Sequence, residues 1–144
     1  VRPQVVRILP GRHWSMFTIA AREQLTRALY RVALDSDRMG YRLEGAPLET
    51  RRGPDVLSEA VVMGAVQIPP GGDPIILMAD RQTTGGYPVV AVVAGIDLPV
   101  VAQIVPGEDV QFRMITVEES YAATVEREHQ LGRVRQALAT RLQQ

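Results

Sequence analysis

The decapeptide Ala79-Asp-Arg-Gln-Thr-Thr-Gly-Gly-Tyr-Pro88 joins two apolar runs, Pro74–Ala79 and Val89–Ala94. Each run has the length and composition of a buried β-strand, so we expect the decapeptide to be a polar connection between two strands. Its two glycines permit positive φ angles and a close approach of the backbone to a bound molecule. The residues alone leave two interpretations open. The polar side chains either hydrogen-bond within their own turn or bind a ligand.

The composition is that of one globular domain of ordinary size. Of the 144 residues, 46% are hydrophobic and 22% are charged, which is typical of a chain with a proper core. The formal net charge of zero argues against nucleic-acid binding through a basic surface. No apolar run approaches the roughly 20 residues that a membrane helix needs. We therefore expect a cytoplasmic protein with neither a membrane nor a nucleic acid as its partner.

The sequence contains neither cysteine nor lysine, and all 16 basic residues are arginines. Without cysteine, disulfides and thiolate chemistry are excluded, and a reducing cytoplasm is compatible with the sequence. Without lysine, the chain cannot supply a P-loop lysine, a Schiff-base lysine or a lysine that carries biotin.

Short apolar segments recur along the chain and predict a mainly β fold. We expect strands at 5–9, 30–34, 41–45, 61–68, 74–79, 87–94 and 109–117. A helix is expected at 14–29, and a short helical turn at 97–103 with Asp97 as its cap. Many short strands at regular spacing, with only a few helices, favour a closed β-barrel with helical attachments.

The C-terminal segment has a different pattern. Thr116-Val-Glu-Glu119 fits a capping box, in which Thr116 caps a helix and Glu119 reaches back to it. We expect the helix to continue to about Leu142. Its apolar stripe is formed by Tyr121, Val125, Leu131, Val134, Leu138 and Leu142. Such a stripe indicates core packing or a partner helix.

Two further groups of polar residues are candidates for a site. The segment Ser36–Glu44 holds two arginines, two carboxylates and a hydroxyl, which either pair with one another or present arginine forks to an anion. Gln67 lies at a strand end, where its amide either satisfies neighbouring backbone or contacts a ligand. The two histidines, His13 and His129, lack the spacing of metal ligands, so we expect no metal site.

Several motifs resemble the family called allophanate hydrolase subunit 2, also known as KipA-like, as biotin-dependent carboxyltransferase or as the C subunit of 5-oxoprolinase. They cover roughly residues 5 to 118. The motifs are Ser36-Asp-Arg-Met-Gly40 with Arg42-Leu-Glu-Gly45, Gly64-Ala-Val-Gln-Ile-Pro-Pro70, Pro74 to Pro88, and Asp97-Leu with Ala102-Gln and Pro106-Gly. The resemblance implies a cyclophilin-like closed antiparallel β-barrel over residues 1–117, with an N-terminal helix, followed by a C-terminal helix over 118–144.

The resemblance also implies partners. Family members are about twice as long as this chain, so we expect it to correspond to their C-terminal half and to work with an N-terminal half. A second expected partner is a KipI-like subunit, of the allophanate hydrolase subunit 1 type. We also expect the distal half of the C-terminal helix to contact another chain, so that the protein forms a homo-oligomer at high concentration.

The function implied by the resemblance is that of a subunit in an ATP-dependent amide-processing enzyme, namely 5-oxoprolinase, which converts 5-oxoproline to glutamate. ATP is then implied, bound by this chain or elsewhere in the complex, and the isolated chain should be inactive. The implied catalytic residues are Asp80, Arg81 and Glu44. The residues implied to bind a small amide or carboxylate substrate are Ser36, Asp37, Arg38, Arg42, Gln67, Gln82, Thr83, Thr84, Gly85, Gly86 and Tyr87, gathered at one end of the barrel.

Two alternatives accompany this expectation. In the first, the chain belongs to the carboxyltransferase part of a urea carboxylase and allophanate system, and biotin arrives in trans because the chain has no lysine to carry it. In the second, the barrel is a non-catalytic regulatory module that acts through the KipI-like partner.

Overall fold

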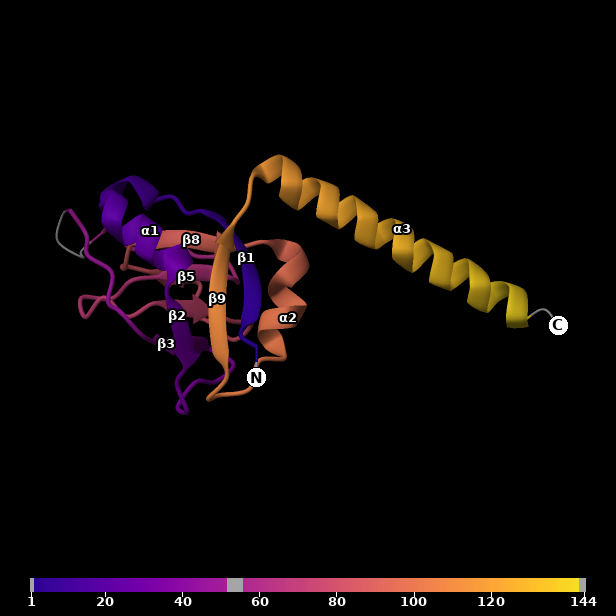
Figure 1. Ribbon diagram of the computed structural model, residues 1–144, viewed down its shortest axis with the longest axis horizontal. Coiled ribbons are helices and arrows are strands. Elements are labelled where there is room, and N and C mark those ends of the chain that lie inside the picture. Colours follow the sequence, from indigo (N-terminus) through magenta and orange to yellow (C-terminus); the bar gives the residue numbers. More distant parts are fainter. Residues whose placement is uncertain (1, 52–55, 143–144) are drawn as a thin grey trace.

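The computed structural model describes residues 2–51 and 56–142. Seven strands of this part form a closed barrel in the order β1-β8-β5-β6-β3-β2-β9 (Figure 1). In that order they span Gln4–Pro10, Val89–Val93, Ala65–Gln67, Ile75–Leu77, Gly40–Glu44, Leu29–Val32 and Asp109–Met114. Two more strands, β4 (Glu59–Ala60) and β7 (Thr84–Gly85), form a separate ribbon. The prediction of a mainly β chain with a closed barrel is confirmed.

Neighbouring strands of the barrel pair antiparallel, as expected, with one exception. The first and last strands, β1 and β9, pair in parallel and close the barrel. Their register places Arg7 beside Arg113. A parallel pair needs a long connection rather than a hairpin, and here nearly the whole barrel supplies it.

The helix predicted at 14–29 is interrupted. A 3-10 turn, η1, occupies Trp14–Met16, and the helix α1 spans only Ile19–Arg27. Thr18 causes the break, because its backbone is extended and its hydroxyl accepts a hydrogen bond from the backbone N–H of Ala21 at 3.0 Å. A threonine in this position caps a new helix rather than continuing an old one.

The strand predicted at 61–68 is also shorter, since β5 starts only at Ala65. Gly64 precedes it with a φ of 87°, in the left-handed region that favours glycine. A Cβ atom at Gly64 would lie 2.8 Å from Cδ2 of Leu98, so the turn has no room for a side chain. The chain therefore turns at Gly64 before it enters the barrel.

Apolar side chains from all seven barrel strands fill the interior. They include Val6, Ile8, Val32, Leu43, Val66, Ile76, Val90 and Phe112. Ala21 and Leu25 of α1 and Val101 of the short helix α2 (Leu98–Ala102) join the same core. Because side chains alternate between the two faces of a strand, the residues next to these on each strand face the outside of the barrel. This alternation positions the site described below.

The C-terminal helix α3 (Val117–Leu142) begins in the predicted capping box and leaves the barrel (Figure 1). The hydroxyl of Thr116 accepts a hydrogen bond from the backbone N–H of Glu119 at 3.1 Å. In return, the Glu119 carboxylate accepts one from the backbone N–H of Thr116 at 3.1 Å. No helix in the described part of the chain has both the length and the apolar character to cross a membrane.

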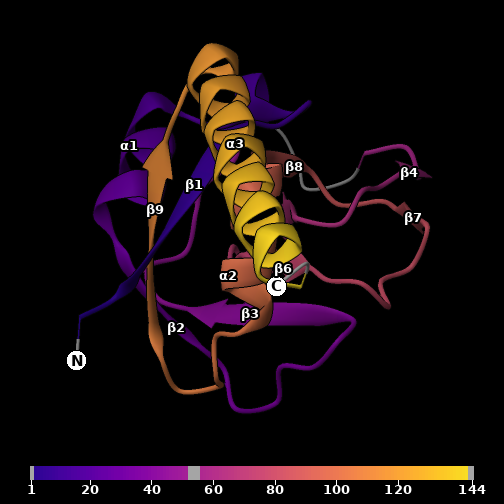
Figure 2. The ribbon, with the colours of Figure 1, turned by 90° about the vertical axis from the view of Figure 1, so that its right-hand side faces the viewer.

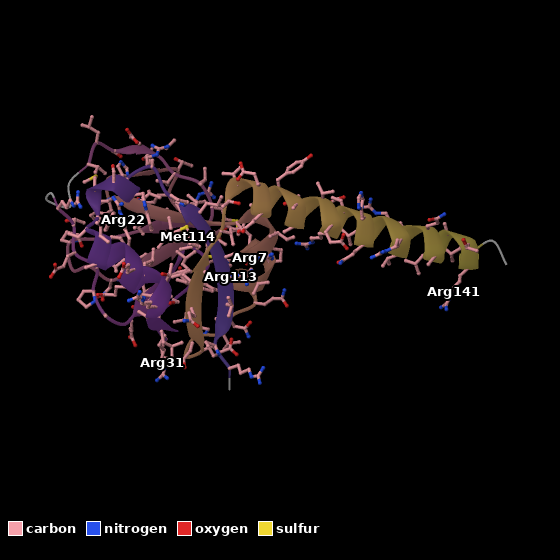
Figure 3. The ribbon with its side chains drawn as sticks, turned by 45° about the horizontal axis from the view of Figure 1, so that its top comes forward. Arg7, Arg22, Arg31, Arg113, Met114 and Arg141 are labelled. Atoms are coloured by element: carbon pink, nitrogen blue, oxygen red, sulfur yellow. The ribbon has the colours of Figure 1, made fainter. Side chains whose placement is uncertain are left out.

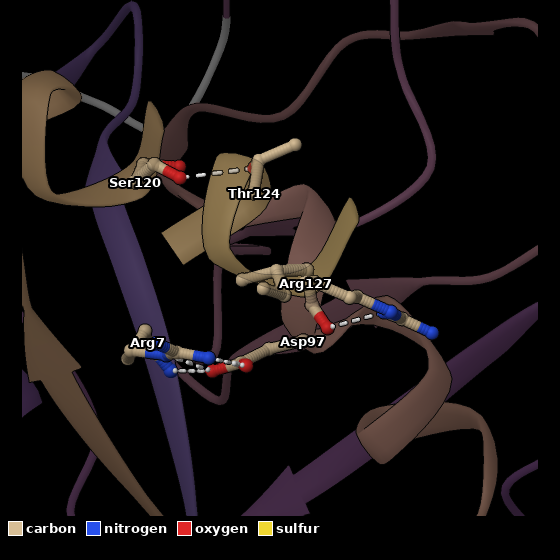
Figure 4. Close-up of polar contacts among 6 residues, drawn as sticks. Arg7, Asp97, Ser120, Thr124 and Arg127 are labelled. Carbon is tan, nitrogen blue, oxygen red and sulfur yellow. Dashed lines mark hydrogen bonds and ion pairs between the residues drawn. The ribbon is translucent and has the colours of Figure 1, made fainter. Parts of the chain in front are cut away.

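Asp97 occupies the predicted N-cap position of α2, but its side chain makes no capping hydrogen bond. It ends the 3-10 turn η2 (Gly95–Asp97), where only 3% of the residue is exposed. Its carboxylate accepts hydrogen bonds from the backbone N–H of Arg7 at 2.8 Å and from Nε of Arg7 at 2.9 Å (Figure 4). Burial by itself would raise the pKa of Asp97, but the hydrogen bonds from Arg7 outweigh burial and hold this pKa below its usual range. The ion pair fixes η2 to β1.

Replacing Asp97 by asparagine should destabilise the fold, because Asp97→Asn removes the counter-charge of Arg7 and misplaces a donor in a buried site. The expected loss in the free energy of unfolding is about 2 to 3 kcal/mol. Urea denaturation would measure it. Asp109→Asn is the matched control, since Asp109 accepts a hydrogen bond from Nε of Arg31 at 3.1 Å in an exposed pair. The control should lose less than about 1 kcal/mol, and equal losses for the two variants would contradict the assignment.

Candidate functional site

A hollow of about 570 Å³ lies against the outer wall of the barrel, a volume that suits a small ligand. We call it the outer hollow. Its lining residues are Asp35, Asp37, Met39, Gly40, Arg42, Val61, Gln67, Ile75, Leu77, Gln82, Thr84, Gly85, Gly86 and Tyr87. The three segments predicted to form a site, 36–44, 67–70 and 80–88, therefore each contribute to one place. That place is the side of the barrel and not one of its ends, which corrects the expected location.

Strands β3, β6 and β5 form the floor of the outer hollow. On these strands Leu43, Ile76 and Val66 fill the core, so their neighbours Arg42, Ile75 and Gln67 face outward. The ribbon of β4 and β7 forms a wall and stands out from the barrel beside β3 and β6 (Figure 2). The floor is thus partly apolar, while the wall brings hydroxyl groups and backbone amides from the decapeptide.

One ion pair ties the wall to the barrel, and two hydrogen bonds join the two strands of the wall to each other. Arg12, just after β1, forms an ion pair with Glu59 of β4. The backbone N–H of Val61 donates to the carbonyl oxygen of Thr83 at 3.0 Å. Nε of Arg81 donates to the carbonyl oxygen of Val61 at 3.3 Å. Arg81, predicted as a catalytic residue, is therefore placed beside the wall and does not line the outer hollow.

Gln67 is the most unusual residue of the floor. It is only 6% exposed, and its Nε2 atom has no hydrogen-bond partner. A buried amide left without a partner costs stability unless a ligand or water satisfies it. The pairing of β5 with β8 shifts register between Val66 and Gln67, and such bulges commonly re-aim a side chain next to a site. Gln67 thus lines the outer hollow, while its unpartnered Nε2 atom lies buried against Gly85 of the wall.

Gly85 makes room for that donor. A Cβ atom at Gly85 would lie 2.4 Å from Nε2 of Gln67, which is closer than two such atoms can approach without a shift of the glutamine. The neighbouring Gly86 is different, because a Cβ atom there would approach nothing closer than the carbonyl oxygen of Val56 at 3.6 Å. Of the two glycines in the decapeptide, Gly85 is therefore the one that the site requires.

Part of the segment Ser36–Glu44 stabilises its own turn. The Ser36 hydroxyl accepts a hydrogen bond from the backbone N–H of Arg42 at 3.0 Å. The Asp37 carboxylate accepts one from the backbone N–H of Met39 at 2.8 Å. Asp37 and Arg42 still line the outer hollow, and Nε of Arg42 lies a loose 3.9 Å from a carboxylate oxygen of Asp35. Ser36 thus serves the turn, Asp37 serves the turn and also lines the hollow, and a role of this segment in anion binding stays a prediction.

Besides Arg81, three of the predicted charged residues lie outside the outer hollow. Arg38 and Asp80 pair with each other at 3.3 Å, with their side chains 90% and 54% exposed. Glu44 faces outward opposite Arg31 of β2 and lines a different recess of the surface. The structure does not bring Glu44 and Asp80 together in the hollow, and their catalytic roles stay predictions.

The structure shows which residues of the decapeptide line the outer hollow, a distinction that the sequence does not make. Gln82, Thr84, Gly85, Gly86 and Tyr87 line the outer hollow, whereas Asp80, Arg81 and Thr83 do not. The sequence interpretation missed the other lining residues, namely Asp35, Met39, Gly40, Val61, Ile75 and Leu77. The alternation of inward and outward side chains along β3 and β6 could have identified Gly40, Ile75 and Leu77 as residues that face the hollow. Within the described residues, no three histidine, aspartate or glutamate side chains gather as metal ligands would.

Comparison with known proteins agrees with this architecture. Residues 1–114 match the family described as the carboxyltransferase domain, subdomain A and B. The chain belongs to this family. It is 40% identical over 127 residues to the C subunit of 5-oxoprolinase from Haemophilus influenzae, and 38% identical over 118 residues to that from Escherichia coli. These matches cover 88% and 82% of the chain. The resemblance inferred from the motifs is confirmed.

Solved structures share the fold. Urea carboxylase of Kluyveromyces lactis matches with a TM-score of 0.77 and 25% identity over 83% of the chain and 11% of its own length. The protein TTHA0988 matches with a TM-score of 0.67 and 35% identity over 78% of the chain and 22% of its own length. The chain spans about 40% of the length of its two curated relatives.

The fit of Gln67 against Gly85 can be tested directly. Gly85→Ala should push the Gln67 amide out of its place, because the new methyl group would occupy the position of Nε2. The side-chain amide signals of Gln67 in a nitrogen–proton NMR spectrum, assigned with Gln67→Met, should therefore shift. Gly86→Ala is the matched control and should leave those signals in place. Equal shifts in both variants would contradict the packing.

His13 provides a pH-dependent contact at the base of the decapeptide. Its Nδ1 accepts a hydrogen bond from the backbone N–H of Val89 at 2.9 Å, which requires a neutral ring. Burial lowers the pKa of His13 from its ordinary 6.5, with smaller opposing effects from Glu59, which raises it, and Arg12, which lowers it. Since the unfolded chain binds the proton more readily, this contribution to stability is complete above pH 6.5 and is lost as the pH falls below it.

The stability of the wild type should therefore fall more steeply than that of His13→Gln when the pH drops from 7 to 5. The glutamine keeps an acceptor oxygen but does not titrate. Thermal melts at a series of pH values would measure the difference between the two proteins. A difference that does not change with pH would show that His13 does not titrate in this range.

Proposed function

We propose that this chain binds the substrate of an ATP-dependent 5-oxoprolinase, which converts 5-oxoproline to glutamate in complex with a KipI-like subunit. The names of both curated relatives support the assignment. The observation that carries it is the unpartnered Nε2 of Gln67 on the floor of the outer hollow. A neutral donor held in a buried position suits the carbonyl oxygen of a small amide.

In this proposal the lactam carbonyl of 5-oxoproline accepts a hydrogen bond from Nε2 of Gln67. The apolar part of the ring lies on Ile75 and Leu77, which face the hollow from β6. The hydroxyl groups of Thr84 and Tyr87 hydrogen-bond the remaining polar atoms. The substrate carboxylate lies toward Arg42, whose 3.9 Å contact with Asp35 is loose enough to be exchanged.

The outer hollow suits the ring amide better than it suits ATP. Its charged lining residues are Asp35, Asp37 and Arg42, so carboxylates outnumber cations and repel a triphosphate. Arg38 and Arg81, first expected to hold anions, are engaged with Asp80 and with a backbone carbonyl. We therefore assign the binding of the ATP phosphates to another part of the complex that adjoins the hollow. When bound, ATP would phosphorylate the lactam oxygen and make the ring carbon open to attack by water.

A second candidate is the carboxyltransferase reaction of a urea carboxylase. It is favoured by the description of the matching family and by the likeness to urea carboxylase of Kluyveromyces lactis. Urea is also a neutral amide, so Gln67 could hold its carbonyl oxygen in the same way. The carboxyl group would arrive on biotin carried by another chain, because this chain contains no lysine.

A binding measurement tests the role of the Gln67 amide. Titration calorimetry with 5-oxoproline should give binding that Gln67→Met weakens about tenfold or more, because the donor is lost while the size of the side chain is kept. Gln103→Met is the matched control, since the Gln103 amide is exposed and donates to the carbonyl oxygen of Pro99 at 2.9 Å, away from the hollow. Unchanged affinity in Gln67→Met would contradict the role of the amide.

Turnover decides the reaction. In the complete assembly with the KipI-like subunit, 5-oxoproline should stimulate ATP hydrolysis, and Gln67→Met should reduce that stimulation. The chain by itself should show little or no turnover, because it spans about 40% of its relatives. Stimulation by urea in place of 5-oxoproline would favour the carboxyltransferase reaction.

A further inference from the structure

Helix α3 has no buried residue along its whole length. Contacts near its first half hold it to the barrel, among them a hydrogen bond from Arg127 to the carbonyl oxygen of Ile96 at 3.2 Å (Figure 4). The rest of the helix extends away from the barrel with side chains on all sides (Figure 3). A helix of 26 residues is about 39 Å long. In proteins most of the stability of such a helix comes from packing an apolar face against another element.

The exposed apolar side chains of α3 share one face. At 100° per residue, Val117, Tyr121, Leu131, Leu138 and Leu142 fall within an arc of about 100°. They are 68%, 71%, 39%, 55% and 87% exposed, so the stripe is open at both ends of the helix. Two more apolar residues flank the arc, Val125 on one side and Val134 on the other. The barrel therefore leaves this face uncovered even where α3 starts.

The charges of α3 are divided between its halves. The first half, 117–129, holds the four acidic residues Glu118, Glu119, Glu126 and Glu128 and the single arginine Arg127. The second half, 130–142, holds Arg133, Arg135 and Arg141 and no acidic residue. The helix dipole favours this order only in the first and last turns. It does not account for Glu126, Glu128, Arg133 and Arg135, which lie in the middle.

We propose that α3 pairs with α3 of a second copy of this chain in an antiparallel orientation. The acidic half of each helix then lies along the basic half of the other, whereas a parallel pair would oppose like charges. The same arrangement aligns the apolar stripes, with Val117 opposite Leu142 and Tyr121 opposite Leu138. The two barrels lie at opposite ends of the pair, so they do not obstruct each other.

Sedimentation equilibrium tests the association. The wild-type chain should form dimers as its concentration rises. Leu138→Glu should weaken the dimer about tenfold or more, because it places an unpaired charge in the contact. Gln136→Glu is the matched control, since it adds the same carboxylate two residues away on the opposite face of the helix, and it should associate nearly as the wild type does. A wild-type chain that stays monomeric, or equal weakening by both variants, would overturn the proposal.

Disulfide cross-linking tests the orientation of the two helices. Because the sequence has no cysteine, only the introduced cysteines can cross-link. A mixture of Tyr121→Cys and Leu138→Cys should form a cross-linked dimer under mild oxidation. Neither variant alone should do so, because in the antiparallel pair Tyr121 lies about 25 Å along the axis from its own copy, far beyond the reach of a disulfide. Cross-linking of each variant with itself would indicate a parallel pair and overturn the antiparallel arrangement.

A charge exchange gives an independent check. Exchanging Arg133 and Arg135 for glutamate makes both halves acidic and should abolish the dimer. Adding Glu126→Arg and Glu128→Arg to that variant reverses the charge order and should restore it. Far-ultraviolet circular dichroism confirms that the helix persists in each variant. Failure of the fourfold variant to recover, with its helix intact, would show that the charges do not direct the pairing.

Discussion

The parallel pairing of β1 with β9 is the constraint on which the rest of the structure depends. It joins the first and last strands and closes the barrel, and its register sets Arg7 beside Arg113. The buried carboxylate of Asp97 binds Arg7 at this seam, and Arg113 adds a smaller effect that also lowers the pKa of Asp97. Asp97 lies at the end of η2, and α3 rests on the same turn through Arg127. One carboxylate thus connects the seam, the turn after β8 and the base of the exposed helix.

A closed and filled barrel leaves only its outer surface for a site. Inside, apolar side chains from every strand occupy the space, so polar side chains must face outward. On β5 the outward-facing Gln67 is buried against Gly85 of the β4–β7 ribbon, which shields its Nε2 from water without giving it a partner. In the proposed function this shielded donor meets the carbonyl oxygen of a small amide. Arg38 and Arg42 pair with carboxylates, and Arg81 donates to a backbone carbonyl. We therefore expect these arginines to contribute less to ligand binding than unpaired arginines would.

The outer hollow and helix α3 differ in the kind of contact that their surfaces suit. The outer hollow combines a buried donor with a partly apolar floor, which is typical of a small-molecule site. Helix α3 instead combines an open apolar stripe with divided charges, which is typical of a helix that pairs with another helix. Because the helix leaves from β9 and the hollow lies on β3, β6 and β5, both surfaces can be occupied at once.

The sequence by itself determined the local elements and the family. Strand positions follow from apolar runs, the capping box at Thr116 is read from four residues, and the ordered motifs identify the family, because each depends only on neighbours along the chain. Only the tertiary structure decided which polar residues share a place. Arg38 and Asp80 pair with each other, Asp97 meets Arg7 across 90 positions, and Gln67 faces Gly85. These relations arise from barrel closure and strand register, which bring distant residues together and which no local pattern encodes.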